Sequence, residues 1–209
     1  MKNFHLYRVI ALCLLIFANV ACVAQTRGDI KDPTKEQLQE FKDLADKRTE
    51  DLLLYIQQLS DKEIPLNLRK RSLNAALSLF EKTDTTTSEG KKTLYPTIQI
   101  SSKTGPTRAI PVNEYLENLM DLKHFAKVKV TSYQVNYSTP FKKGPDGRYH
   151  STSYYYQNFV GEYKDKKMVY RSKDRKAINV MVGQSYKNDT FIMSFGNITV
   201  EETESSISN

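Results

Sequence analysis

The chain has 209 residues and a formal net charge of +7, with two cysteines, both close to the N-terminus. This length favours one domain, or one domain with an extension. The charge excess is mild and no nucleic-acid-binding motif is present, so we expect no nucleic-acid partner. Basic groups such as "NLRKRS" and "RSKDRK" are typical of solvated turns and helix faces, with contact to an anionic surface as the alternative.

The first 24 residues have the three-part pattern of a secretory signal peptide. A weakly basic start precedes an apolar run from Val9 to about Ala18, and small residues then lead to Ala24 and Gln25. The apolar run is shorter than the roughly 20 residues that a membrane-spanning helix needs. We therefore predict cleavage after Ala24, export, and no transmembrane segment in the remaining chain.

A lipoprotein signal is the alternative interpretation of the same segment. In that case the chain would be cleaved behind Ala21, and a lipid on Cys22 would tether the protein to a membrane. Asn19 stands where such signals usually carry leucine, which favours the soluble form. Cleavage after Ala24 would remove both cysteines, so the mature chain would have no disulfide, no thiolate nucleophile and no cysteine zinc site.

Residues 25–31 are expected to be a linker, and residues 32–203 a single domain. Apolar residues at steps of three and four, from Leu38 to Leu59, predict a first amphipathic helix that ends at "SDKEIP". A second helix is predicted from about Leu66 to Lys82. The polar stretch "TDTTTSEGKK" that follows is expected to be a break between elements.

A short hairpin and a third helix are predicted next. Ile98 and Ile100 alternate with polar residues and "KTGP" is a turn signal, which fits a hairpin of Tyr95–Ser101 with Thr107–Ile110. The stretch "IPVNEYLENLMDLKHF" then has one apolar stripe at helical spacing.

From Ala126 onward the periodicity of the apolar residues changes to two, which predicts a β-sheet. Short turn-forming connections such as "KKGPDGR" make consecutive strands antiparallel neighbours. The four predicted strands cover residues 127–138, 152–163, part of 168–182, and 190–201. The polar tail, residues 204–209, is expected to be disordered.

Two of these strands change the face on which their apolar residues lie. Val130 and Tyr133 fall on opposite faces of the first strand, and so do Phe195 and Ile198 in the last. One extra residue, a β-bulge, would return the apolar groups to one side, and Gly196 stands at the change in the last strand. The alternative is that the two ends of each strand are buried on opposite faces. Both interpretations predict strong curvature or a second covering layer.

The predicted order of elements is helix, helix, hairpin, helix and four strands, an α+β fold with helices on a strongly curved antiparallel sheet. This order, with "VNEYLENLMDL" as the third helix and "TFIMSFGNITVEET" as the closing strand, resembles the cone-shaped superfamily of nuclear transport factor and ketosteroid isomerase, grouped as cystatin-like. The closing strand is similar to that of small exported proteins from Gram-negative bacteria, so the resemblance implies a place in the periplasm or on the outer surface of such a cell. It also implies a pocket at the open end of the cone. It implies no activity, because enzymes, ligand binders and adaptors share such folds.

The stretch "STSYYYQNFVGEY" carries a cluster of tyrosines. Strand alternation places Tyr155, Phe159 and Tyr163 toward the helices, and Tyr154 and Tyr156 on the outer face. With Tyr133 and Tyr137 on the neighbouring strand, Tyr154 and Tyr156 form a candidate binding platform for a sugar or peptide. An ordinary half-buried strand is the simpler interpretation of these tyrosines, since the ring packs and the hydroxyl meets water.

No catalytic motif is present. His124 and His150 stand in different contexts, and no paired histidines, cysteine cluster or phosphate-binding glycine loop occurs, so we expect no metal, no cofactor and no catalytic residue. Glu114 and Asp121 on the third helix are the only acids to consider for a pocket. The remaining acids in the predicted sheet are expected in turns or facing outward, namely Asp165, Asp174, Asp189 and Glu162.

Three functions stay open. The first is an exported, non-catalytic binding or interaction module whose partner is a small molecule, a glycan or an envelope protein. The second is a small-molecule isomerase or lyase of the cone-shaped fold, which needs an acid or a histidine deep in the cone. The third is a structural or assembly component of the cell envelope, for which the oligomeric state is the discriminating observation.

Overall fold

The computed structural model describes residues 32–87, 90–101, 107–136, 138–164, 167–185 and 190–208. The chain divides into two units, Met1–Thr34 and Lys35–Asn209, and all the described helices and strands belong to the second. The predicted leader, with the cleavage site at Ala24 and Gln25 and the alternative lipidation site at Cys22, lies outside the described residues.

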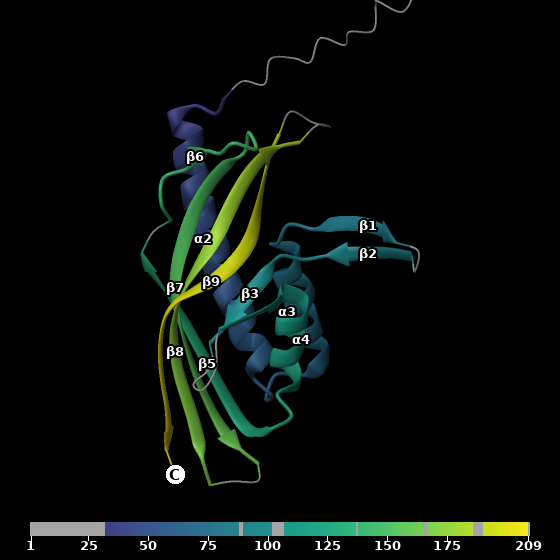
Figure 1. The fold of residues 1–209 in the computed structure, drawn as a ribbon, viewed down its shortest axis with the longest axis vertical. Coiled ribbons are helices and arrows are strands. Elements are labelled where there is room, and N and C mark those ends of the chain that lie inside the picture. The colour runs from purple at the N-terminus through teal and green to yellow at the C-terminus, as the bar shows by residue number, and fades with distance from the viewer. Residues whose placement is uncertain are drawn as a thin grey trace, which may run out of the picture. The chain divides into compact units, whose positions relative to one another are not determined.

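Three helices cover one face of the sheet, as the apolar stripes predict. They are α2 (Lys35–Ser60), α3 (Leu66–Ser78) and α4 (Val112–Asp121). The long helix α2 runs along the sheet (Figure 1) and buries one apolar stripe against it: Ala45, Leu52, Leu53, Ile56 and Leu59. No helix of the described residues is long and apolar enough to cross a membrane.

The second helix is shorter than predicted. It ends at Ser78 rather than near Lys82, because the chain turns there to place Phe80 beside Phe195 in an isolated bridge. The two rings meet edge to face with their centroids 5.8 Å apart. Both phenylalanines are buried. Phe80 therefore packs in the core as predicted, although it lies beyond the end of the helix.

Seven strands form the main sheet, in the spatial order β4-β3-β9-β8-β7-β5, with β6 paired to β7. All the neighbours are antiparallel except β3 and β9, which are parallel at Ile98 and Ile198. The α+β class and the four long antiparallel strands are confirmed. The strands are β3 (Thr97–Ile100), β4 (Arg108–Pro111), β5 (Phe125–Asn136), β6 (Lys142–Lys143), β7 (Tyr149–Tyr163), β8 (Val169–Gln184) and β9 (Phe191–Ser208).

A separate hairpin stands where the sequence predicted only a polar break. Its strands β1 (Thr83–Thr87) and β2 (Gly90–Leu94) pair with each other and project from the main sheet (Figure 1). The hydroxyl of Thr93 donates to the carboxylate of Asp84 across the pair at 2.8 Å. Threonine is a good strand former even without an apolar pattern, which is why periodicity alone missed this hairpin.

The bend of the sheet includes the predicted bulge at Gly196. Opposite the step from Ile178 to Val180 on β8, β9 runs from Ile198 to Phe195 and so has one extra residue. The extra residue turns Ile198 and Phe195 to the same side, and both are buried. A second irregularity on the same strand pair lies opposite Arg175 and Lys176.

In β5 the predicted bulge is absent from the expected position. Val130 and Tyr133 lie in uninterrupted register with β7, so they keep opposite faces and only Val130 is buried. The extra residues of β5 are instead Ala126 and Val135, near the two ends of the strand. Tyr133 is 47% exposed, so burial of this strand on opposite faces at its two ends, the alternative interpretation, does not hold at Tyr133 either.

Residues 204–208 of the polar tail form a strand instead of the expected disordered segment. β9 continues to Ser208, and its last residues pair with the start of β8, from Ser208 opposite Val169 to Glu204 opposite Lys173. Polar residues can form a strand at this position because one face of the extended β8–β9 ribbon is open to water. The last strand is thus longer than the predicted residues 190–201.

Candidate functional site

A cavity of about 260 Å³ lies between the β3–β4 hairpin, helix α4 and the inner face of β7 and β8. Its apolar lining comes from Ile100, Leu119, Leu122, Phe125, Phe159 and Tyr170. Its polar lining comes from Ser101, Arg108, Tyr115, Asn118, Gln157, Ser172, Asp174 and Lys176.

Two cross-strand pairs bring the polar groups of the cavity floor together. Gln157 on β7 lies opposite Asp174 on β8, and Tyr155 lies opposite Lys176. Residues two apart on a strand share a face, so all four side chains point to the helix side of the sheet. All four are buried, and Lys176 is only 1% exposed. The inner face of the sheet therefore carries an ionisable pair inside the core.

Asp174 is held by hydroxyl groups from two distant parts of the chain. Ser101, at the end of β3, donates to Asp174 Oδ2 at 2.9 Å. Thr203 on β9 donates to Asp174 Oδ1, also at 2.9 Å. Each carboxylate oxygen thus accepts a hydrogen bond, which offsets the cost of burying its charge.

Lys176 has looser contacts than Asp174. Its Nζ donates to the carbonyl oxygen of Gln99 at 3.3 Å and lies 3.9 Å from Asp174 Oδ2, at the outer limit of an ion pair. It also lies 5.4 Å from the centre of the Tyr115 ring. Burial lowers the pKa of Lys176 to about 8, and the nearby Asp174 carboxylate opposes that shift.

Tyr115 on α4 covers the polar floor from the helix side. Its hydroxyl donates to Gln157 Oε1 at 3.1 Å, and burial raises its pKa above the ordinary range for tyrosine. This bond fixes the amide of Gln157, whose Nε2 is buried and has no hydrogen-bond partner among the described residues. The hydroxyl of Tyr155 is likewise buried and unpartnered there, and burial raises its pKa as well. Unpartnered buried donors are uncommon and need an explanation.

Aromatic rings form one wall of the cavity. Phe159 contacts both Phe125 and Tyr170, with centroid distances of 5.4 Å and 5.8 Å. Gly161 lies behind this wall, and a Cβ added to it would come within 2.5 Å of the Phe125 ring. The glycine therefore allows Phe125 to lie flat against β7 and close this side of the cavity.

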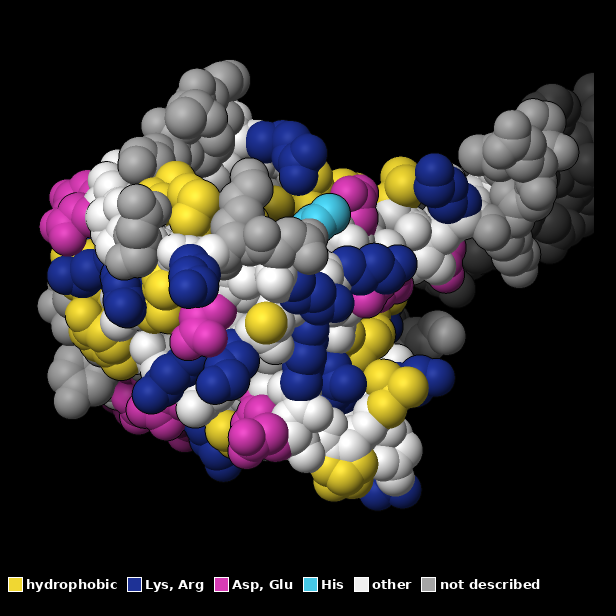
Figure 2. All heavy atoms as spheres, turned by 90° about the horizontal axis from the view of Figure 1, so that it is seen from below, with side chains coloured by type: hydrophobic (Ala, Val, Ile, Leu, Met, Phe, Trp, Pro, Cys, Tyr) yellow, Lys and Arg dark blue, Asp and Glu magenta, His cyan; other side chains and the backbone are white. Residues whose placement is uncertain are grey.

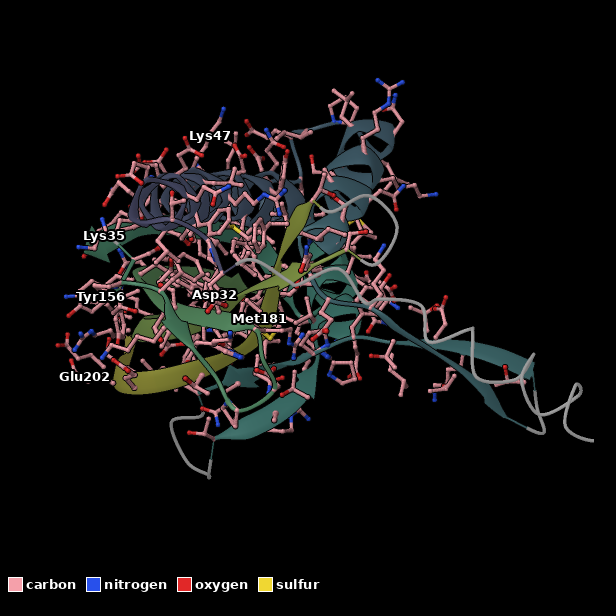
Figure 3. All side chains as sticks on the ribbon, turned by 90° about the horizontal axis from the view of Figure 1, so that it is seen from above. Asp32, Lys35, Lys47, Tyr156, Met181 and Glu202 are labelled. Carbon is pink, nitrogen blue, oxygen red and sulfur yellow. The ribbon has the colours of Figure 1, made fainter. Side chains whose placement is uncertain are left out.

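The sequence-predicted platform lies on the opposite face of the sheet. Tyr133 is 47% exposed and stands opposite Tyr156, with the ring centroids 5.6 Å apart. Tyr154 and Tyr156 are half-buried, whereas Tyr155 is fully buried, as alternation predicts. Figure 3 shows Tyr156 and Glu202 projecting from the sheet toward solvent, and Lys47 projecting from α2 on the side away from the sheet. Tyr137 lies outside the described residues.

Basic side chains already cover the platform rings in part. Lys173 Nζ lies 4.7 Å from the centre of the Tyr156 ring, and Arg175 Cζ lies 5.2 Å from that of Tyr154. Figure 2 shows lysine and arginine side chains interspersed with acidic and apolar ones at the end of the unit where the chain terminates. These contacts are those of a solvated sheet face, so the platform stays a prediction.

The expected positions of the acids were wrong for the cavity. Asp174 does not lie in a turn but near the middle of β8, where it is 6% exposed and lines the cavity. Glu114 and Asp121, the two acids singled out for a pocket, are both exposed on α4. Asp165 and Asp189 lie outside the described residues.

Metal-binding side chains do not cluster among the described residues. No group of three or more His, Cys, Asp or Glu side chains gathers among them. His150 Nε2 lies 2.9 Å from Asp146 Oδ1 in an exposed turn, and hydrogen bonds from His150 and Arg148 hold the pKa of Asp146 far below its usual value. This contact orders the turn before β7 and lies outside the cavity lining.

Comparisons with known proteins leave the family of the chain open. No protein-family model and no curated protein matches the sequence. Among solved structures, ActVI-ORFA from Streptomyces coelicolor is similar, with 12% sequence identity and a TM-score of 0.39 over 76% of this chain and 96% of that chain. A likeness this distant shows no family for this chain, so membership in the cone-shaped superfamily stays a prediction.

Proposed function

We propose that the protein is a ligand-binding module whose cavity takes a small, largely apolar molecule with an oxygen acceptor at one end. The observation that carries this proposal is the amide of Gln157. Its oxygen is occupied by the Tyr115 hydroxyl, and its Nε2 is a buried donor without a partner among the described residues. Gln157 is one of the residues that line the cavity. A ligand carbonyl or carboxylate would supply the missing acceptor.

The remaining lining supports the same ligand class. Phe125, Phe159 and Leu119 provide apolar walls for a hydrocarbon part, and about 260 Å³ suits a molecule of one or two small rings. Lys176 adds a second donor to the polar floor. An oxygen acceptor that meets both donors would gain charge-assisted hydrogen bonding in a site with little water.

An isomerase or lyase is the second candidate, and the buried carboxylate of Asp174 is the observation that favours it. Such an enzyme needs a base that can reach the ligand. Both oxygens of Asp174 already accept hydroxyl hydrogen bonds from Ser101 and Thr203. This arrangement supports an electrostatic role for Asp174 beside Lys176, and binding without turnover is therefore our first choice.

Binding of simple probes tests the proposal. We expect acetophenone and benzoate to bind in the cavity about tenfold more tightly than ethylbenzene, because only the first two satisfy the unpartnered amide of Gln157. Replacing Gln157 with leucine should remove that preference. Dissociation constants from ligand-observed NMR measure the effect, and chemical-shift changes of backbone amides locate the site.

Asn158→Leu is the matched control, since it removes the neighbouring amide on the other face of β7. Tyr154→Ala and Tyr156→Ala report on the outer tyrosine platform. Equal affinities for the three probes in the wild-type protein would count against the cavity as the binding site. Loss of binding in the Tyr154 and Tyr156 variants, with Gln157→Leu unaffected, would support the platform instead.

We also propose that the module is exported from a Gram-negative cell. The basic start, apolar run and small residues before Gln25 support this proposal. Expression in a Gram-negative host should yield a periplasmic protein whose first residue is Gln25 or its cyclised form, as measured by mass spectrometry. A lipid on Cys22 would change the soluble module into an anchored one, and an intact Met1 in the cytoplasm would overturn export altogether.

A further inference from the structure

We propose that Lys176 captures carbonyl ligands covalently: its amine condenses with an aldehyde or ketone held in the cavity and forms an imine with loss of water. This inference rests on the proposed function, since it names the acceptor oxygen of the ligand as that of a reactive carbonyl. The imine would hold the ligand by a reversible covalent bond in addition to the non-covalent contacts of the cavity.

The position of Lys176 is the first argument. Its amine lines the cavity, while its side chain is only 2% exposed, so a carbonyl compound reaches it by filling the cavity. Of the three N–H groups of the ammonium, one has a hydrogen-bond acceptor among the described residues, the carbonyl of Gln99 at 3.3 Å. Asp174 at 3.9 Å is too far to accept a second hydrogen bond.

The protonation state supports reaction at neutral pH. Only a neutral amine can attack a carbonyl carbon, and an ordinary lysine is almost entirely charged. Because burial lowers the pKa of Lys176 to about 8, roughly a tenth of the molecules carry the neutral amine near neutral pH. Desolvated lysines of this kind are the usual nucleophiles for carbonyl substrates.

The neighbouring groups fit each step of the condensation. The nitrogen lone pair forms a bond to the carbonyl carbon as the C=O π electrons move to oxygen, and the unpartnered amide of Gln157 would donate to that oxygen. Gln157 is the diagonal neighbour of Lys176 across the β7–β8 pair, about 7–8 Å away at the backbone, within reach of two long side chains. Transfer of the two nitrogen protons to oxygen releases water and leaves the imine.

Reductive trapping with benzaldehyde tests the inference on the full-length protein. Cyanoborohydride converts an imine into a stable benzyl amine, and tandem mass spectrometry of proteolytic fragments assigns each modified lysine. We expect Lys176 to be labelled about tenfold faster than Lys173 on the outer face of the same strand, because the cavity concentrates the aldehyde at the amine. Benzoate should slow labelling of Lys176 and leave Lys173 unchanged.

Three variants test the roles of Lys176 and Gln157. Lys176→Met should lose the cavity adduct and keep labelling elsewhere. Gln157→Leu should slow labelling of Lys176, whereas Asn158→Leu should not.

The rate of labelling at Lys176 decides the inference. Labelling of Lys176 no faster than Lys173 overturns it. If benzoate and acetophenone still bind in the cavity in that case, the binding function stands and only the covalent step is lost. If neither binds, both proposals fail together.

Discussion

Replacing Lys176 with methionine should stabilise the protein by about 2 kcal/mol at neutral pH, although it removes a buried polar contact. Burial lowers the pKa of Lys176 from 10.5 to about 8, which corresponds to about 3 kcal/mol spent on keeping the ammonium charged. The lost hydrogen bond to Gln99 returns about 1 kcal/mol of that gain. The Asp174 carboxylate, whose attraction is already included in the lowered pKa, keeps its hydrogen bonds from Ser101 and Thr203. Methionine fills nearly the same volume without a charge, so packing should be kept.

The same substitution should change how stability depends on pH. Between pH 8 and 10.5 the unfolded chain binds the Lys176 proton and the folded chain does not, so the free energy of unfolding rises with pH across that window. Above pH 10 the buried hydroxyls of Tyr115 and Tyr155 act in the opposite direction, because the folded chain keeps protons that the unfolded chain releases. The rise should therefore be visible from pH 8 to about 10 and absent in Lys176→Met.

Urea unfolding at several pH values measures both effects, with Lys173→Met as the control on the outer face of β8. Lys173 is half-buried on that face, so its replacement should leave the slope with pH unchanged. A Lys176→Met variant that is less stable than wild type at neutral pH, or that keeps the alkaline rise, would contradict the burial of this charge.

Asp174→Asn should lower the free energy of unfolding by about 3 kcal/mol at neutral pH, because it leaves the buried ammonium of Lys176 without its counter-charge. The loss should shrink toward pH 9.5, where Lys176 is largely neutral in the folded protein. In a chain that already carries Lys176→Met, Asp174→Asn should lower the free energy of unfolding by only about 1 kcal/mol. That loss reflects the hydrogen bonds from Ser101 and Thr203, which asparagine cannot fully accept.

Asp121→Asn is the matched control for this prediction. Asp121 pairs with Lys123 at 2.9 Å, but both side chains are exposed, so its replacement should change stability by about 0.5 kcal/mol or less. Chemical denaturation of the wild type, the two single variants and the double variant forms a double-mutant cycle, which gives the coupling energy between Asp174 and Lys176 directly. Additive effects of the two single substitutions would mean that the pair does not interact across 3.9 Å.

The elements with a strong apolar period could be predicted from the sequence, because burial of one face is what makes them form. The stripe on α4 placed Tyr115 and Leu119 correctly, and the change of face in the last strand predicted the bulge beside Gly196. The β1–β2 hairpin and the end of β9 escaped prediction, since both rely on backbone pairing between polar residues, which leaves no apolar period to detect.

The cavity site was missed for a different reason. The charged run "RSKDRK" is typical of a turn, and Asp174 was interpreted that way. A usable signal was nevertheless present, because Asp174 and Lys176 alternate in phase with Ile178 and Val180 and so share their buried face. The partners of Asp174 could not have been found this way. Ser101 and Thr203 are 73 and 29 residues away, and only the fold brings them to one carboxylate.

The bond from Thr203 has a practical consequence for anyone who produces this protein. The C-terminal part of β9 supplies this hydroxyl to the cavity floor. A proteolytic cut within β9 during purification would therefore act on the ligand site as well as on the sheet. Recombinant versions intended for binding assays should keep β9 intact through Ser208.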